Sequence, residues 1–171
     1  MTTYVALLRA VNVGGTGKLP MTELREMCEA AGFTNVRTYI ASGNVVFDST
    51  LAKRAAQQAL ERSLEAYAGK PVGVLIRTGN EMAAVLDANP FRDEAPNRTV
   101  AIFLDAAPPA DTLKHIAGQQ NEQVALGKHE IYVHYGDGMA KTKLKIPAAK
   151  TGTARNINTI AKLAEWASQS R

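Results

Sequence analysis

A glycine-rich segment near the N-terminus has the composition of an anion-binding loop. It reads Asn12-Val13-Gly14-Gly15-Thr16-Gly17-Lys18 and lies between an apolar run that predicts a strand, Tyr4 to Arg9, and a helix predicted to begin near Pro20. Free amides at a helix N-terminus favour phosphate groups. Asn12 and Pro20 stand where the P-loop and the dinucleotide-binding patterns require glycine, so the segment matches neither. It therefore predicts either a structural turn or general anion contacts.

A second candidate is a stretch without acidic residues in the C-terminal part of the chain. No Asp or Glu occurs between Asp137 and Glu165, and the basic residues there are Lys141, Lys143, Lys145, Lys150, Arg155 and Lys162. Such a run attracts anions if it folds onto one face, and is otherwise a set of solvated side chains.

Thr153-Ala154-Arg155-Asn156 is predicted to begin the last helix, with Thr153 as its N-cap. Arg155 would then lie in the first turn and oppose the helix dipole. This placement indicates an anionic partner for Arg155, either a ligand or a carboxylate of the protein itself.

The other reactive residue types give weaker signals. Ser42-Gly43-Asn44 at a predicted hairpin tip could expose a nucleophile, but a nucleophile elbow requires glycine two residues to either side of the serine, and a tight turn explains the residues better. The three histidines lack metal-ligand spacing, and Cys28 lies on an apolar helix stripe. We therefore expect no metal and no cofactor.

The elements that would carry these residues follow the order β-α-β-β-α-β in the first half. Strands are predicted at 4–9, 35–40, 44–47 and 72–77, and helices at about 20–31 and 51–68. Thr78 and Glu81 have capping-box spacing at the start of a further short helix. In the second half, strands are predicted at 99–104, 122–126 and 130–135, and helices at 111–117, 139–144 and 153–168, with no closing strand.

This order predicts an α+β fold of two ferredoxin-like (α/β plait) units in tandem, with antiparallel sheets and helices on one face. The expected domains are residues 1–90, with a connecting helix, and 91–171, with the C-terminal helix. The composition, 46% hydrophobic and 21% charged residues with a net charge of +4, is that of a globular protein. A single cysteine, no signal sequence and no long apolar run predict a cytoplasmic protein with no membrane partner.

Several blocks of the sequence resemble a known family. Val5-Ala6-Leu7-Leu8-Arg9 leading into Asn12-Val13-Gly14-Gly15, and Thr38 to Phe47, are similar to the domain of unknown function 1697 family. Asn89-Pro90-Phe91 and Thr153-Ala154-Arg155-Asn156 resemble its later signatures. The resemblance implies two ferredoxin-like units in a bacterial cytoplasmic protein, and no assigned activity. The chain departs from the family pattern at Ala10, Thr142 and Ile157.

Three classes of function remain open at this level, and so does the oligomeric state. One is an enzyme for a small molecule with its site between the two halves, around Arg9, Ser42, Asn44 and Arg155. Another is a protein-interaction module that pairs through an exposed sheet edge. The favoured class is binding of a phosphate-bearing ligand (a nucleotide, nucleic acid or sugar phosphate) through residues drawn from Arg9, Asn12, Gly14, Gly15, Lys18, Ser42, Gly43, Asn44, Lys141, Lys143, Arg155 and Asn156.

Overall fold

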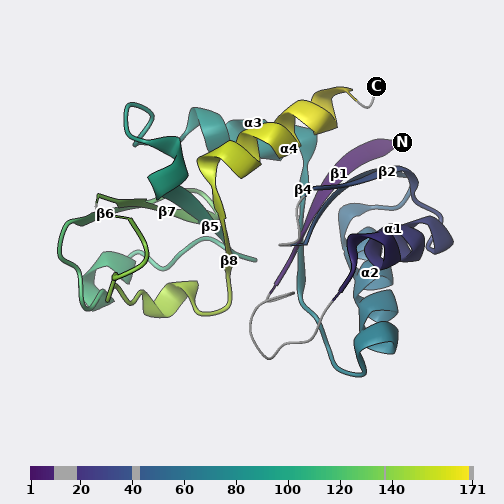
Figure 1. The fold of residues 1–171 in the computed structure, drawn as a ribbon, viewed down its shortest axis with the longest axis horizontal. Coiled ribbons are helices and arrows are strands. Elements are labelled where there is room, and N and C mark those ends of the chain that lie inside the picture. Colours follow the sequence, from purple (N-terminus) through teal and green to yellow (C-terminus); the bar gives the residue numbers. More distant parts are fainter. Residues whose placement is uncertain (10–18, 40–42, 137, 170–171) are drawn as a thin grey trace. The chain divides into compact units, whose positions relative to one another are not determined.

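The computed structural model of the protein describes residues 1–9, 19–39, 43–136 and 138–169 (Figure 1). The chain divides into two compact units: Met1–Met82 together with Lys162–Arg171, and Ala83–Ala161. The domain boundary expected between residues 90 and 91 stays a prediction.

The first unit has the predicted β-α-β-β-α-β order. Its elements are β1 (Thr2–Leu8), α1 (Met21–Ala30), β2 (Thr34–Tyr39), β3 (Asn44–Ser49), α2 (Lys53–Ala68) and β4 (Val74–Thr78). The central strand β1 pairs antiparallel with β3 on one side and β4 on the other, and the strand order is β2-β3-β1-β4. This arrangement confirms the ferredoxin-like prediction for the first unit.

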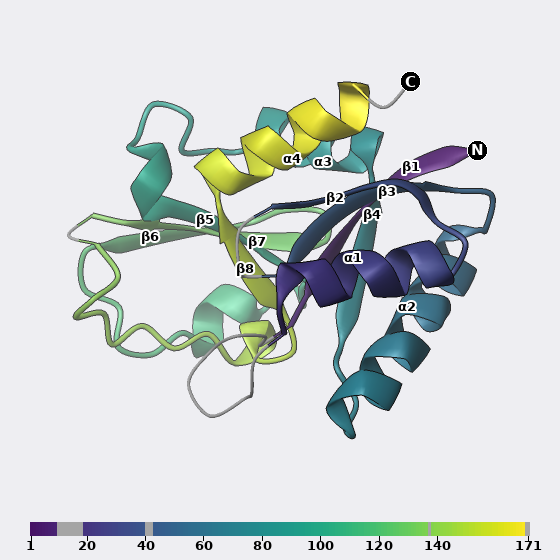
Figure 2. The same ribbon diagram turned by 45° about the vertical axis from the view of Figure 1, so that its right-hand side comes forward.

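Both helices of the first unit cover the same face of its sheet (Figure 2). Alternate residues of β1, namely Tyr4, Ala6 and Leu8, point to this face because side chains alternate along a strand. They meet the apolar stripes of α1 and α2, and Phe33 stacks on Phe47 with 4.1 Å between the ring centroids. The core of the first unit therefore comes from the period-two and helical patterns that the sequence shows.

Local signals set the ends of these helices as predicted. α2 ends at Gly69, whose φ of 74° is left-handed backbone that glycine adopts without strain. α3 (Gly79–Asp87) follows β4 and begins with a complete capping box. The Thr78 hydroxyl accepts the Glu81 N–H at 3.1 Å, and the Glu81 carboxylate accepts the Thr78 N–H at 2.8 Å.

The second unit has a sheet of the same topology with fewer helices. Its elements are η1 (Pro96–Arg98), β5 (Thr99–Phe103), η2 (Thr112–His115), β6 (Glu122–Leu126), β7 (Glu130–Tyr135), η3 (Pro147–Ala149), β8 (Thr153–Asn156) and the start of α4 (Ile157–Gln169). The strand order β6-β7-β5-β8 repeats that of the first sheet.

The expectations for residues 153–156 of the second unit are wrong. Thr153–Asn156 is not a helix start but the closing strand β8, which pairs with β5, so this unit does have a fourth strand. The helix begins only at Ile157, and its N-terminal N–H groups are met by Asn156, whose side-chain oxygen accepts the Thr159 N–H at 2.8 Å. Thr153 is therefore not the N-cap.

Strand register relates the two sheets residue by residue. Val5 pairs with Arg77 in the first sheet, and Ala101 pairs with Arg155 in the second. Counting from these pairs, Tyr4, Ala6 and Leu8 correspond to Val100, Ile102 and Leu104. Both triplets belong to the apolar cores of their own units.

The same face of the two sheets is covered in different ways. Helices cover it in the first unit, whereas in the second it is covered by a segment without α-helix that contributes Leu144, Ile146, Ala148 and Ala149. The helix predicted at 139–144 is accordingly wrong, because the structure has turns and extended backbone there. Among the helices in the described part of the chain, none is long and apolar enough to cross a membrane.

A single core deletion tests the packing of the first unit. Leu60 on α2 is fully buried, so Leu60→Ala should lower the free energy of unfolding by about 2–5 kcal/mol, through lost burial and the cavity left behind. Urea unfolding followed by fluorescence of Trp166, which belongs to this unit, measures the loss. Leu51 is 37% exposed, so Leu51→Ala should change stability by less than about 0.5 kcal/mol. Equal effects of the two substitutions would contradict the assigned core.

Candidate functional site

Three lysines of the acid-free stretch form one exposed row. Lys141, Lys143 and Lys145 are exposed, whereas the alternating residues Thr142, Leu144 and Ile146 are half-buried. Leu144 and Ile146 pack against the core of the second unit. Lys141 lies in the turn closed by the Thr142 N–H and the Met139 carbonyl. From Lys143 to Lys145 the chain leads into the bridge with Ala117, and extended backbone that rises about 3.3 Å per residue places alternate side chains on one side at intervals of about 7 Å. We call Lys141, Lys143 and Lys145 the lysine row.

The backbone of the row is fixed by pairing with the segment after η2. Lys145 and Ala117 exchange two backbone hydrogen bonds, of 2.8 and 3.0 Å. Gly118, with a φ of 71°, lies so close to the Lys143 carbonyl that a Cβ atom at this position would collide with it. The close approach explains why glycine occupies position 118, and it holds the row against the second unit.

A buried glutamate also anchors the row. Glu122, on β6, is 6% exposed. Its carboxylate accepts the Thr142 hydroxyl at 2.5 Å and the Gln120 N–H at 2.7 Å. The Thr142 hydroxyl oxygen accepts the Leu144 N–H at 3.2 Å. The hydrogen bond from Thr142, with that from the Gln120 amide, lowers the pKa of Glu122, because both bonds favour the ionised carboxylate.

Arg155 and Asn156, two more of the predicted site residues, have positions that the fold explains. Arg155 on β8 is 7% exposed and donates to the Thr153 hydroxyl at 2.6 Å and to the Ala154 carbonyl at 2.9 Å. Burial lowers the pKa of Arg155 to about 10. Asn156 caps α4. Neither residue is part of the exposed lysine row, and contact of either with a ligand stays a prediction.

In the first unit, the structure brings Arg9, Gly43 and Asn44 to the same end of the sheet. The Gly43 carbonyl accepts the Leu8 N–H at 2.9 Å, and the Arg9 N–H donates to the Gly73 carbonyl at 2.9 Å. Asn44 is buried and donates its side-chain amide to the Tyr39 carbonyl at 3.0 Å. Gly43 and Asn44 thus close the β2–β3 hairpin. The other predicted residues, Asn12, Gly14, Gly15, Lys18 and Ser42, lie outside the described residues.

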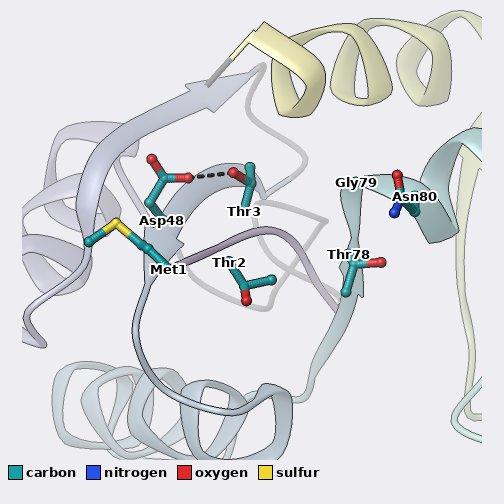
Figure 3. Close-up of a pocket in the computed structure, with 7 residues that line it drawn as sticks. All are labelled: Met1, Thr2, Thr3, Asp48, Thr78, Gly79 and Asn80. Carbon is teal, nitrogen blue, oxygen red and sulfur yellow. Dashed lines mark hydrogen bonds between the residues drawn. The ribbon is translucent and has the colours of Figure 1, made fainter. Parts of the chain in front are cut away.

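A polar pocket that the sequence did not indicate lies at the opposite end of β1. It has a volume of about 470 Å³ and is lined by Met1, Thr2, Thr3, Asp48, Thr78, Gly79 and Asn80 (Figure 3). The carboxylate of Asp48 accepts the Thr3 hydroxyl at 2.6 Å and the Asn35 side-chain amide at 2.8 Å. The one carboxylate of the pocket is therefore already held by residues of the sheet.

A second group missed by the sequence analysis has the connectivity of a catalytic triad. His134 Nδ1 lies 3.0 Å from the Thr99 hydroxyl oxygen, and His134 Nε2 lies 3.4 Å from the Glu94 carboxylate. A nucleophile must reach its substrate. Thr99 is 0% exposed and its hydroxyl donates to the Ala95 carbonyl at 3.0 Å, so the group ties β5, β7 and the preceding loop together. We assign it a structural role.

Metal and thiol chemistry have no site in the described residues. Within the described ranges, no three His, Cys, Asp or Glu side chains come together as metal ligands. Cys28 is fully buried, and burial, with a contribution from the charge of Glu29, raises the pKa of its thiol to about 12. The thiol is thus held in its unreactive protonated form at neutral pH.

The two four-stranded antiparallel sheets of identical strand order define an α+β protein of two tandem ferredoxin-like units. The chain belongs to the family described as "Protein of unknown function (DUF1697)", whose model matches residues 1–132. This confirms the family resemblance.

A solved structure extends the likeness over nearly the whole chain. The conserved bacterial protein SP0830 from Streptococcus pneumoniae is similar with a TM-score of 0.80 and 26% sequence identity, over 97% of this chain and 98% of that one. No curated protein is a significant match.

Removing a hydrogen bond of Glu122 should make the lysine row more accessible to protease. An amide can accept at one oxygen only, so Glu122→Gln removes one of the two hydrogen bonds that the carboxylate accepts. Trypsin at neutral pH should then cleave after Lys141, Lys143 and Lys145 faster than in the unsubstituted protein. Asp111→Asn, an exposed carboxylate of the same unit, is the matched control and should leave these rates unchanged. Equal rates for the Glu122→Gln variant and the unsubstituted protein would remove the anchoring role.

The same anchor should weaken at low pH. The pKa of Glu122 in the folded protein is lower than its ordinary value of 4.5, so its stabilising effect is complete above pH 4.5 and is lost as the pH falls through the lowered value. Hydrogen-exchange protection of residues 142–146 should be constant from neutral pH to about pH 5 and fall below that. If the hydrogen-exchange protection of residues 142–146 already falls between pH 7 and 5, a group other than Glu122 anchors the row.

Proposed function

We propose that the protein binds the phosphate backbone of nucleic acid through the lysine row. The observation that carries the proposal is the alternation from Lys141 to Ile146, in which three exposed lysines alternate with half-buried residues on a segment whose backbone is held at Lys145. Between Lys143 and Lys145 the spacing of about 7 Å that extended backbone gives is comparable to that between successive phosphates of an extended nucleic-acid strand.

The physical basis is the release of counterions. A Lys ammonium is a compact, rotatable point charge that contacts a phosphate without requiring one fixed orientation. Each phosphate that such a charge neutralises releases condensed cations, which gives binding that is independent of base sequence and sensitive to salt. The lysine row therefore fits a repeating anion, the phosphodiester backbone.

A single small phosphate fits the row less well. An isolated exposed ion pair contributes only about 0–1 kcal/mol in water, so one phosphate against one or two exposed lysines would bind weakly. A nucleic-acid strand makes several such contacts at once, but the loss of translational and rotational freedom on binding is incurred only once. This argument favours nucleic acid over a nucleotide or sugar phosphate.

The small-molecule alternative, expected around Arg9, Ser42, Asn44 and Arg155, stays a prediction. A different small-molecule site has one observation in its favour, the polar pocket beside Thr3 and Asp48. Both of these side chains are buried and hydrogen-bonded to each other, and Asp48 also accepts from Asn35. Groups that are already paired in this way give a ligand little to bind, so we place this alternative second.

Salt dependence provides the test of the lysine row. A fluorescently labelled 12-nucleotide single strand should raise its anisotropy with the protein. We compare the slope of the logarithm of the affinity against the logarithm of the salt concentration for the unsubstituted protein and for a variant without the three lysines. The slope of the unsubstituted protein should be steeper by about 2, since each of three neutralised phosphates contributes about 0.7. The variant combining Lys141→Gln, Lys143→Gln and Lys145→Gln should lose this component and bind much more weakly at low salt.

Two exposed lysines away from the row provide the controls. Lys128→Gln in the second unit and Lys70→Gln in the first each remove one charge, and neither should reduce the affinity as Lys143→Gln does. If all single substitutions reduce the affinity alike, only net charge matters and the proposed site is wrong. If the strand does not bind at low salt, the proposed function itself is wrong.

A further inference from the structure

The first unit carries a group of three stacked side chains outside both the lysine row and the polar pocket. The guanidinium carbon of Arg37 lies 3.9 Å from the centroid of the Trp166 ring. The ring of Tyr39 meets that of Trp166 edge to face, with 5.2 Å between centroids and an interplanar angle of 80°. We call Arg37, Tyr39 and Trp166 the stacked cluster.

The fold gives the stacked cluster its position. Thr38 pairs with Val45, which points into the core beneath α1 and α2. Arg37 and Tyr39, on either side of Thr38, therefore project from the opposite face of β2, which is an edge strand of the first sheet. Trp166 reaches this face from the part of α4 that belongs to the first unit.

The exposure of the stacked cluster suits a ligand with a flat ring. Arg37 is exposed, and Tyr39 and Trp166 are half-buried, so the two aromatic rings are anchored while the cation on them remains accessible. The guanidinium is a planar, delocalised cation that stacks on aromatic faces. The cation–π contact with Trp166 restricts the Arg37 side chain before any ligand binds. Arg37 therefore loses less conformational entropy when the ring of a ligand stacks on it.

We infer that the stacked cluster is a base-stacking site that accepts an unpaired nucleobase, and hence that the nucleic acid bound by this protein is single-stranded. Base pairs in a duplex already stack on both faces, whereas an unpaired base has a free face for Arg37. Stacking on arginine and aromatic side chains tolerates any base, which agrees with a backbone contact that reads no sequence. The inference rests on the proposed function, since it names the class of nucleic acid.

Trp166 is the single tryptophan of the chain, so its emission reports directly on the stacked cluster. Three probes of equal length separate base from backbone: a 12-nucleotide thymidine strand, the same strand with every base removed, and the duplex. The thymidine strand should quench Trp166 emission with saturation. The abasic strand should bind through its phosphates with salt dependence but leave the emission unchanged, and the duplex should not quench it.

Substitution of Arg37 then tests the stacking itself. Arg37→Lys keeps the charge but loses the plane, and should weaken binding of the thymidine strand by about fivefold or more while leaving the abasic strand unaffected. Arg62→Lys on the exposed side of α2 is the matched control and should change neither. Unchanged thermal unfolding of the Arg37→Lys protein separates a binding effect from a folding effect.

The outcomes distinguish this inference from the proposed function. Equal binding of thymidine and abasic strands, with no quenching, would overturn the stacking site and leave backbone binding by the lysine row intact. Quenching that Arg37→Lys does not change would also overturn it. Failure of every strand to bind at low salt would overturn the proposed function and the stacking site together.

Discussion

An apolar sheet face must be covered, and the way each unit meets this requirement determines the rest of its structure. In the first unit two amphipathic helices cover Tyr4, Ala6 and Leu8 and their neighbours. In the second unit the corresponding face is covered by the chain from Leu144 to Ala149, which has no α-helix. An extended segment that buries one side must expose the other, and that other side is where the lysines lie. The charged row is thus a direct result of packing in the second unit.

The shared strand register places different polar residues at equivalent positions of the two sheets. Thr3 pairs with Asp48 in the first sheet, and Thr99 pairs with His134 in the second. In each pair the threonine hydroxyl is hydrogen-bonded to the facing side chain, and a third polar residue holds that side chain from its other side. The same positions thus carry a buried polar tie in both units, although the residue types differ. This repetition supports a structural role for both ties.

The sequence sufficed wherever a pattern was local and complete. The element order of the first unit, the capping box at Thr78 and the strands at 122–126 and 130–135 all rest on short-range signals, and the structure has each of them. Thr153–Asn156 was missed because four residues are too few to show a strand period, and a threonine before a helix resembles an N-cap. The alternation at 141–146 was not predicted because its outward positions are all lysine, a residue type that is as common on the exposed side of a helix as in an extended segment.

The candidate sites divide in the same way. The lysines could be named from composition, but their alignment depends on Gly118 and Glu122, which precede them by more than a dozen residues and contact them only in the fold. The stacked cluster could not be found from sequence, because Arg37 and Trp166 are far apart in the chain and neither lies in a recognisable pattern. Residues 10–18 and 40–42, which include parts of the first two blocks that resemble the family, lie outside the described residues.

The discontinuity of the first unit has a consequence for how the protein is made. Residues 162–171 belong to this unit but are translated after the whole of the second unit. Gly79 approaches Ala167 closely enough that an added Cβ would lie 3.1 Å from the Ala167 Cβ, and Trp166 completes the group with Arg37 and Tyr39. Domains of a nascent chain generally fold from the N-terminus onward. Here the first unit cannot gain its final contacts until the ribosome has synthesised the entire second unit.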